Sequence, residues 1–241
     1  MSRPTGAPCW TDLLTSDSEG ARAFYSEVFG WTAGEETADF GGYFMFILDG
    51  APVAGCMRNH PGTGLPDSWS VYLSTRDAKA AADKAVARGG ALLAGPAAIA
   101  DLGIEAVLTD ASGAGIGLWQ AGVFHGFPEF TGKPGTPAYF ELLTRDYQGA
   151  IDFYREAFAW EASVLTDDYQ ALARIIDATQ ILPPNDPGHW DTFFKVADAD
   201  ATLDMVTRLG GSVLEETTET PFGRLATAAD PAGARFKLMG V

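Results

Sequence analysis

The 241-residue sequence is poor in the residues that mark redox, metal and nucleotide sites. Its two cysteines, Cys9 and Cys56, form no CxxC pair, and we expect two reduced, buried thiols. The three histidines lie more than sixty positions apart and belong to no HExxH or HxH motif. GxGxxG, Walker, GxSxG and SxxK motifs are also absent, so the usual signals of nucleotide-binding folds and serine hydrolases are missing.

Positive charge and long apolar runs are scarce as well. Thirty-two acidic residues stand against sixteen basic ones, the five lysines are scattered, and the net charge of −16 repels phosphate backbones. No apolar run approaches the roughly 18–20 residues that span a bilayer, and the N-terminus has no apolar segment typical of export signals. We therefore expect a cytoplasmic protein that binds neither nucleic acid nor membranes.

The chain does contain abundant apolar residues and an internal repeat. Apolar residues make up 46% and aromatic residues 12% of the chain, which is enough for packed cores. The segment Asp12-Leu-Leu-Thr-Ser-Asp17 returns 129 residues later as Glu141-Leu-Leu-Thr-Arg-Asp146. Further anchors return at offsets of 129, 121 and 120: Phe24-Tyr25 as Phe153-Tyr154, Trp69 as Trp190, and Asp110 as Asp230. Repeated spacing of this kind indicates two homologous halves.

Each half divides again into two units with the order strand, helix and three strands. The first unit starts with a strand at 9–14, and the apolar spacing over 21–29 predicts one face of a helix. Strands are predicted at 43–48 and 53–57, separated by the hairpin dipeptide Asp49-Gly50. The same order restarts at residue 69, with a helix over 77–88. The stretch 122–137, rich in glycine and proline, is typical of an interdomain linker.

This organisation resembles the vicinal oxygen chelate (VOC) superfamily of glyoxalases, bleomycin-resistance proteins and extradiol dioxygenases. The resemblance rests on the strand-Asp-helix starts with Phe-Tyr and Phe-x-Trp, and on the Asp-x-x-Gly turn before the last strand of each half. It implies an α+β fold of four βαβββ modules, numbered 1 to 4 along the chain, forming two tandem domains with open β-barrel cups. The implied domains are residues 8–121 and 138–241. Modules could also pair across the two halves.

The resemblance also implies where metal ligands would lie. Metal enzymes of the family carry His, Glu or Gln on the first and last strands of each module. These positions are Trp10, Ser70, Tyr139 and Asp191 on the first strands and Gly117 and Lys237 on two last strands, with Gly55 and Ile181 near the other two. Asp191 is the one carboxylate among the positions that can be placed, whereas a divalent ion needs about three converging donors. We therefore expect no metal and no cofactor.

Strand alternation predicts which residues line the cups. Asp12 and Glu141 are candidate catalytic residues, because a carboxylate in an aromatic pocket can act as a general acid or base. Pairing with backbone amides or a neighbouring arginine is the structural alternative. The candidate ligand-binding residues are Trp10, Leu14, Met57, Ser70, Tyr72, Gly117, Trp119, Tyr139 and Phe193. Gly117 is expected to leave space for a ligand in the first cup, and Asp191 and Lys237 are expected to fill the second as an ion pair.

An aromatic lining favours a flat, apolar small molecule with a few polar atoms. One function is a metal-independent binding protein, such as a drug-sequestering resistance protein. Another is a tailoring enzyme of secondary metabolism, an isomerase, cyclase or hydroxylase-like helper acting on an aromatic or polyketide-like metabolite. A glyoxalase-type lyase acting on a 2-oxoaldehyde adduct is the alternative that the missing ligands disfavour. We expect a monomer or simple homodimer, because each cup is already supplied with two modules by one chain.

Overall fold

The computed structural model describes residues 3–128, 132–160 and 173–240. Residues 129–131 of the expected linker, and residue 241 at the end of the second expected domain, lie outside the described residues. Within the described part of the chain, no helix has the length and hydropathy required to cross a bilayer.

The secondary structure repeats the strand-helix-strand order of each module. Module 1 comprises β1 (Pro8–Thr15), α1 (Ser18–Phe29), β2 (Thr32–Ala33), β3 (Phe44–Leu48) and β4 (Ala51–Arg58). Module 2 comprises β5 (Ser68–Ser74), α2 (Ala78–Ala87), β6 (Ala91–Ile99), β7 (Gly103–Thr109) and β8 (Gly115–Ala121). Module 3 comprises β9 (Pro137–Thr144), α3 (Tyr147–Phe158) and β10 (Ala173–Asp177). Module 4 comprises β11 (His189–Val196), α4 (Ala199–Arg208), β12 (Ser212–Thr220), β13 (Gly223–Ala229) and β14 (Arg235–Gly240).

Each main helix begins where the sequence predicts. Its first turn follows an aspartate whose carboxylate accepts a hydrogen bond from a backbone amide, which satisfies one of the otherwise unpaired donors of a helix start. The four capping residues are Asp17, Asp77, Asp146 and Asp198.

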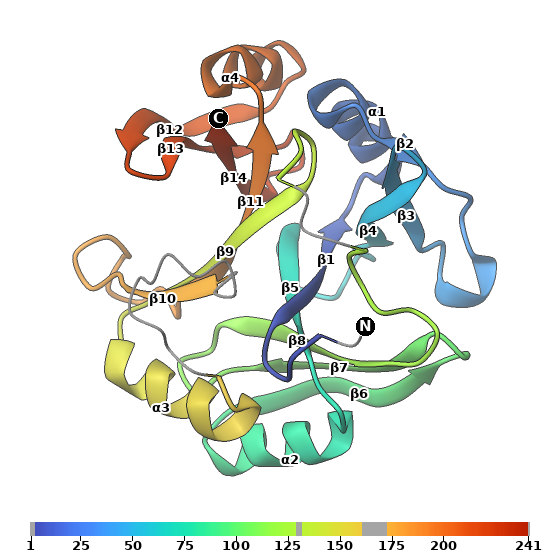
Figure 1. The fold of residues 1–241 in the computed structure, drawn as a ribbon, viewed down its shortest axis with the longest axis vertical. Helices are drawn as coiled ribbons and strands as arrows, with labels where there is room; N and C mark the ends of the chain where they lie inside the picture. Colours follow the sequence, from blue (N-terminus) through green and yellow to red (C-terminus); the bar gives the residue numbers. More distant parts are fainter. Residues whose placement is uncertain (1–2, 129–131, 161–172, 241) are drawn as a thin grey trace. The chain divides into compact units, whose positions relative to one another are not determined.

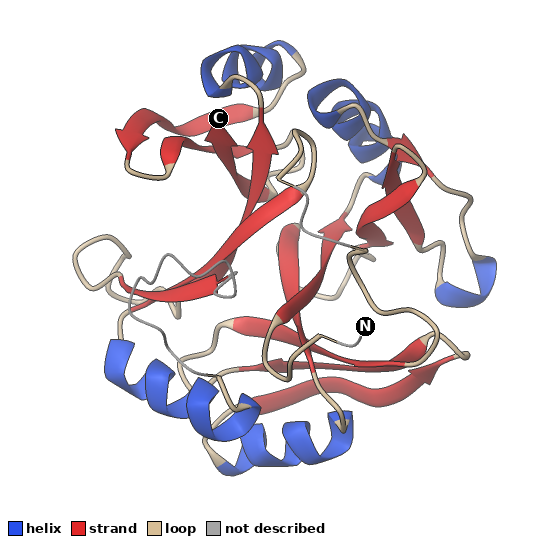
Figure 2. Ribbon diagram, viewed as in Figure 1, coloured by secondary structure: helices blue, strands red, loops and turns tan. Residues whose placement is uncertain are grey.

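The strands form two open sheets. The eight-stranded sheet has the order β2-β3-β4-β1-β5-β8-β7-β6, and the six-stranded sheet has the order β10-β9-β11-β14-β13-β12. Each sheet therefore contains strands from two modules that are consecutive in the chain. In the described part of the chain, the two edge strands of a sheet, β2 and β6 in the larger and β10 and β12 in the smaller, do not pair with each other, so neither sheet closes into a barrel. The strands and helices are shown in Figure 2. The expected α+β fold of four modules is confirmed.

The first strand of every module pairs in parallel with a later strand of the same module. These pairs are β1 with β4, β5 with β8, β9 with β10, and β11 with β14. This pairing sets the register at which side chains from the two strands meet, and it is the basis of the site described below.

The chain also divides into two compact units that interleave along the sequence. The first unit contains Met1–Trp10, Ser70–Gly126 and Phe140–Asp191, and the second contains Thr11–Trp69, Phe127–Tyr139 and Thr192–Val241. In the first unit α2 contacts α3, and in the second α1 contacts α4 (Figure 1). Helix packing thus joins module 2 to module 3 and module 1 to module 4, whereas the sheets follow chain order.

Repeated anchor residues form one buried hydrogen-bonded chain in each unit. In the second unit the Tyr25 hydroxyl accepts from Trp69 Nε1 and donates to Asp230 Oδ2, both at 3.0 Å. In the first unit Tyr154 accepts from Trp190 Nε1 at 3.0 Å and donates to Asp110 Oδ2 at 3.2 Å. All six side chains are buried. The repeat that reveals the duplication therefore also supplies the polar contacts inside both cores.

Aromatic packing surrounds the chain of hydrogen bonds in the second unit. Phe29 of α1 lies 4.9 Å from Phe194 of β11 and 5.8 Å from Phe236 of β14, measured between ring centroids. Each buried aromatic side chain of this size contributes roughly 1.5–3 kcal/mol. Modules 1 and 4 therefore share one continuous core.

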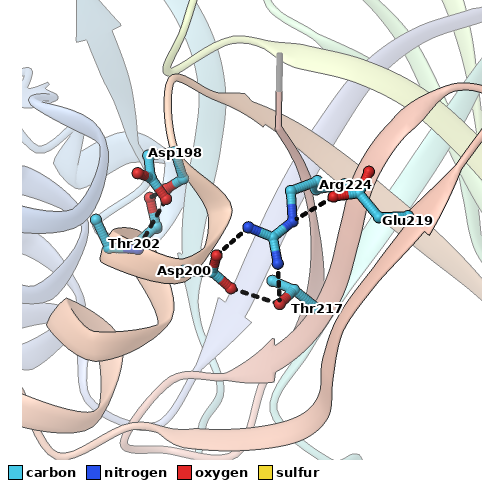
Figure 3. A network of polar contacts seen from close by, with 7 residues as sticks. Asp198, Asp200, Thr202, Thr217, Glu219 and Arg224 are labelled. Carbon is cyan, nitrogen blue, oxygen red and sulfur yellow. Dashed lines mark hydrogen bonds and ion pairs between the residues drawn. The ribbon is translucent and has the colours of Figure 1, made fainter.

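A charged surface network joins α4 to the β12–β13 hairpin of the second unit (Figure 3). Arg224 forms ion pairs with Asp200 and with Glu219, the latter at 3.0 Å, and donates to the Thr217 hydroxyl at 3.1 Å. These ionic side chains are 42–77% exposed, so each pair contributes at most about 1 kcal/mol. The network orients the hairpin and is no candidate for chemistry.

Candidate ligand-binding site

Three aromatic rings meet near the end of β8 in the first unit. Trp10 of β1 packs edge-on against Phe124 with ring centroids 4.9 Å apart, and Trp119 of β8 lies 5.9 Å from the same ring. Trp10 and Trp119 are buried, whereas Phe124 is half-buried. We call these three residues the aromatic cluster. It offers one partly accessible ring backed by two buried ones.

The orientation of Trp119 is fixed at both ends of its side chain. Its indole N–H donates to the backbone oxygen of Phe124 at 2.8 Å. Its ring lies over Gly103 of β7, where an added Cβ would be 2.6 Å from the indole. A side chain at position 103 would therefore displace the indole from the aromatic cluster.

A tyrosine–carboxylate pair lies on the two strands that flank β8, β5 and β7. The Tyr72 hydroxyl, from β5, donates to Glu105 Oε1, on β7, at 2.8 Å. Tyr72 stands opposite Gly117 of β8, and a Cβ there would lie 2.2 Å from Tyr72 Cδ1. The missing side chain at 117 thus allows the phenol ring to reach across β8 to Glu105. Glu105 is also the cross-strand partner of Trp119, which places it beside the aromatic cluster.

The expectation that Gly117 leaves open space for a ligand is wrong. The Tyr72 ring occupies the space above Gly117. Open space does occur above Gly115, where no atom lies within 4 Å of an added Cβ. A role of Gly117 in ligand binding would therefore act through the position of Tyr72.

Module 1 carries the same arrangement with acid and phenol exchanged. The Tyr43 hydroxyl donates to Asp12 Oδ1 at 3.0 Å, and Asp12 stands opposite Gly55 of β4. A Cβ on Gly55 would lie 2.0 Å from the Tyr43 hydroxyl and 2.1 Å from Asp12 Oδ1. Asp12 corresponds to Tyr72, because each stands opposite the glycine of its module. Tyr43 corresponds to Glu105, because each lies two residues before the residue that pairs with that glycine on its other side, Met45 or Val107.

Modules 3 and 4 have a cation where modules 1 and 2 have glycine. Arg174 of β10 stands opposite Glu141 and donates through Nε to its Oε1 at 2.7 Å; the Glu141 side chain is 5% exposed. Lys237 of β14 stands opposite Phe193, with its ammonium 5.1 Å from the ring centroid. Pairing with an arginine is the structural alternative for Glu141, and its catalytic role stays a prediction.

The last-strand position in module 3 is Arg174 and not Ile181. Ile181 is 62% exposed and lies in a turn beyond β10, because the paired part of that strand ends at Asp177. The expected pairing in module 4 is also shifted by two residues, since Lys237 lies opposite Phe193 and not Asp191. Asp191 is buried, with Oδ1 3.6 Å from His189 Nε2.

The remaining predicted residues lie on the expected strands. Leu14 and Met57 are register partners on β1 and β4, and both are half-buried. Ser70 is half-buried on β5. Tyr139 lies 5.9 Å from Phe193, between ring centroids.

The residues at the positions used by the metal enzymes of the family do not fit a divalent ion. Gly117 lies beneath the Tyr72 ring, and Lys237 brings a positive charge to the equivalent position of module 4. Over residues 3–128, 132–160 and 173–240, no three His, Cys, Asp or Glu side chains converge in a way that could hold a metal. Side-chain donors are too few for the coordination that such ions require.

Three residues of the site escaped sequence prediction: Tyr43, Glu105 and Phe124. A signal for Glu105 was present in the sequence. The turn Asp110-Ala-Ser-Gly113 places Thr109 opposite Gly115, and extending this register along the hairpin places Glu105 opposite Trp119, as the structure shows. Phe124 lies in the stretch 122–137 that the sequence predicts to be a linker, and that stretch has no periodicity from which a site residue could be predicted.

Comparison with known proteins agrees with this architecture. The sequence profile of the Glyoxalase/Bleomycin resistance protein/Dioxygenase superfamily matches residues 9–118 and 136–238. The chain belongs to this superfamily. Similar proteins include the anthracycline biosynthesis protein DauV of Streptomyces sp. (strain C5), 35% identical over 97% of this chain and 93% of DauV.

Two other comparisons extend this picture. CFP32 of Mycobacterium tuberculosis, whose name includes the word glyoxylase, is 34% identical over 97% of this chain and 94% of its own. The solved structure of the 2,3-dioxygenase LapB from Pseudomonas sp. KL28 superposes with a TM-score of 0.65 at 14% identity, covering 100% of this chain and 94% of LapB. The likeness to LapB concerns the fold alone.

Proposed function

We propose that the protein binds a planar aromatic, polyketide-like metabolite at the aromatic cluster of Trp10, Trp119 and Phe124 and serves secondary metabolism without a metal ion. The observation that carries this proposal is the aromatic cluster beside the Tyr72–Glu105 pair. Rings stack on flat ligands, with about 0.5–1.5 kcal/mol per favourable ring pair, and a few polar groups at the edge fix the orientation.

The relatives support the ligand class. Anthracyclines, the compounds in the name of DauV, contain fused planar rings that match an aromatic surface. The second sheet is less suited to such a ligand, because Arg174 and Lys237 occupy the positions of Gly55 and Gly117. Binding alone would suffice for a sequestering role, and a tailoring role would add proton transfer by Glu105 or Asp12.

Equilibrium dialysis of protein pretreated with EDTA tests this function. The probe is 2-hydroxyanthraquinone, followed by mass spectrometry of the recovered probe to detect turnover. We expect a one-to-one complex whose affinity does not change when Zn²⁺, Ni²⁺, Mn²⁺ or Fe²⁺ is added. Binding that requires one of these ions, or no binding at all, contradicts the proposal.

A glyoxalase reaction is the competing function, and the name of CFP32 favours it. It is tested with the glutathione adduct of methylglyoxal and the same four ions. Because the residues at the family's metal positions do not fit a divalent ion, we expect no turnover. Metal-dependent conversion of the adduct would show that the glyoxalase assignment is correct.

A further inference from the structure

Glu105 and Glu141 differ in burial and in the partner of the carboxylate. Glu141 is almost fully buried and pairs with Arg174. Glu105 is half-buried beside the aromatic cluster, and in the described part of the chain no lysine, arginine or histidine forms an ion pair with it. It accepts a hydrogen bond from a phenol, the Tyr72 hydroxyl, at 2.8 Å.

A carboxylate accepts hydrogen bonds and donates none, so a ligand group that reaches Glu105 must be a donor. The carboxylate has two oxygens with about four acceptor positions, and Tyr72 uses one of them. The Tyr72 ring lies over Gly117 on β8 while its hydroxyl reaches the acid, so the protein itself displays the geometry in which a flat phenol meets this carboxylate.

The duplicated arrangement in module 1 supports a role for the pair as such. Asp12 and Tyr43 make the same kind of bond over Gly55, with the acid on the first strand and the phenol immediately before β3. An exchange of this kind retains the phenol–carboxylate bond across a glycine while changing which side of the glycine supplies the acid and which the phenol. A single acid needed only for packing would not require both partners and the glycine to be present in both modules.

We infer that Glu105 selects ligands that carry a phenolic or enolic hydroxyl at the edge of their ring system. The hydroxyl would donate to the Glu105 carboxylate while the rings stack at Phe124, and Tyr72 would be the positioning residue that holds the acid. This inference rests on the proposed function and specifies its substrate class as hydroxylated aromatics.

The experiment compares three ligands by equilibrium dialysis at about pH 6, where the ligand phenol is protonated. They are 2-hydroxyanthraquinone, 2-methoxyanthraquinone, which has no donor, and 2-(aminomethyl)anthraquinone, which carries an ammonium group. A hydrogen bond to a charged acceptor corresponds to a preference of about ten- to a hundredfold for the hydroxyl over the methoxy compound. In Glu105→Gln this preference should fall to within about threefold, with methoxy affinity unchanged.

Two further variants make the comparison specific. Tyr72→Phe keeps the Glu105 carboxylate but removes the hydrogen bond that orients it. The preference for the hydroxyl over the methoxy compound should therefore fall less in Tyr72→Phe than in Glu105→Gln. Glu216→Gln, an exposed acid on β12, makes the same charge change in the other unit and should leave the preference intact. Unchanged methoxy affinity in Glu105→Gln also shows that the variant is folded.

Several results would overturn the inference while leaving the proposed function in place. One is anthraquinone binding by the wild type with the same hydroxyl preference in Glu105→Gln. Another is loss of that preference in Asp12→Asn and not in Glu105→Gln, which would assign the hydroxyl to module 1. A stronger affinity for the ammonium compound than for the hydroxyl compound would also contradict it. Failure of the wild type to bind any of the three overturns the proposed function itself.

Discussion

The hydroxyl of Tyr72 lies 2.8 Å from Oε1 of Glu105 and donates a hydrogen bond to it. The two residues belong to β5 and β7, and the strand between them, β8, carries Gly117 at the crossing point. Position 117 is therefore a steric requirement of the pair, and the nearby Gly115 offers a control on the same strand.

Gly117→Ala should weaken both the fold and ligand binding. The new methyl group would overlap the Tyr72 ring, and overpacking of this kind costs typically about 1–3 kcal/mol. Gly115→Ala, where the space is open, should stay within about 0.5 kcal/mol of the wild type. Urea unfolding measures the free energy of unfolding of the two variants, and equilibrium dialysis measures ligand binding. Equal losses for the two variants would show that the Tyr72 ring does not lie over β8.

Tyr25→Phe should destabilise the protein by about 1–3 kcal/mol. The change removes both the acceptor of Trp69 Nε1 and the donor to Asp230, and buried polar groups left without partners cost about this much. Tyr147→Phe, on the exposed side of α3, is the matched control and should be nearly neutral. The free energy of unfolding in urea is the measurement, and a neutral Tyr25→Phe would contradict the proposed importance of the buried network.

Stability should fall as the pH rises above about 9. Burial raises the pKa of the Cys56 thiol to about 12 and that of the Tyr25 hydroxyl well above its ordinary value. The unfolded chain releases these protons from about pH 8.5 upward, whereas the folded chain holds them, so alkaline pH favours unfolding. Between about pH 8 and pH 10 the Cys56 contribution alone is about 1–2 kcal/mol.

Urea unfolding of the wild type and Cys56→Ala at the two pH values isolates that contribution. The loss of stability on going from the lower to the higher pH should be smaller in the variant, whatever its stability at the lower pH. Equal losses in both proteins would show that Cys56 is not the group that titrates on unfolding.

Arg174→Leu should cost up to about 3 kcal/mol, because it leaves the buried Glu141 carboxylate without its guanidinium. Adding Glu141→Gln to this variant should recover part of the loss, since a neutral amide is cheaper to bury. Thermal unfolding of the two single variants and the double variant gives the coupling free energy between Arg174 and Glu141. Full ligand binding by a folded double variant fits a structural role for Glu141, and loss of turnover without loss of binding would restore its catalytic role.

The sequence predicted the modules well because their signals are local or repeated. The capping aspartates, such as Asp17 and Asp146, and the apolar face of α1 depend on residues a few positions apart. The offsets between Tyr25 and Tyr154, or Asp110 and Asp230, identify equivalent residues in the two halves. They do not say which copy contacts which, and the structure joins Tyr25 to Asp230 and Tyr154 to Asp110.

The candidate site was only partly predictable for a related reason. Strand alternation gives the face on which Trp10, Tyr72 and Trp119 lie, but it cannot give the direction of a side chain along the sheet. Glycine at 117 predicts a gap in the row of side chains, and only the structure shows that the Tyr72 ring fills it. Cross-strand partners such as Glu105 depend on register, which a single misjudged turn would change.

Fluorine NMR of protein labelled with 5-fluorotryptophan tests the central claim most directly. Trp10 and Trp119 belong to the aromatic cluster, whereas Trp31, Trp69, Trp160 and Trp190 lie elsewhere in the two units. Resonances are assigned by single Trp→Phe variants, and 2-hydroxyanthraquinone is added to the EDTA-treated protein. Ring-current shifts of the Trp10 and Trp119 signals, with the other four signals unchanged, are the predicted result. Shifts confined to the other four tryptophans, or no shift at any of them, would contradict ligand binding at the aromatic cluster.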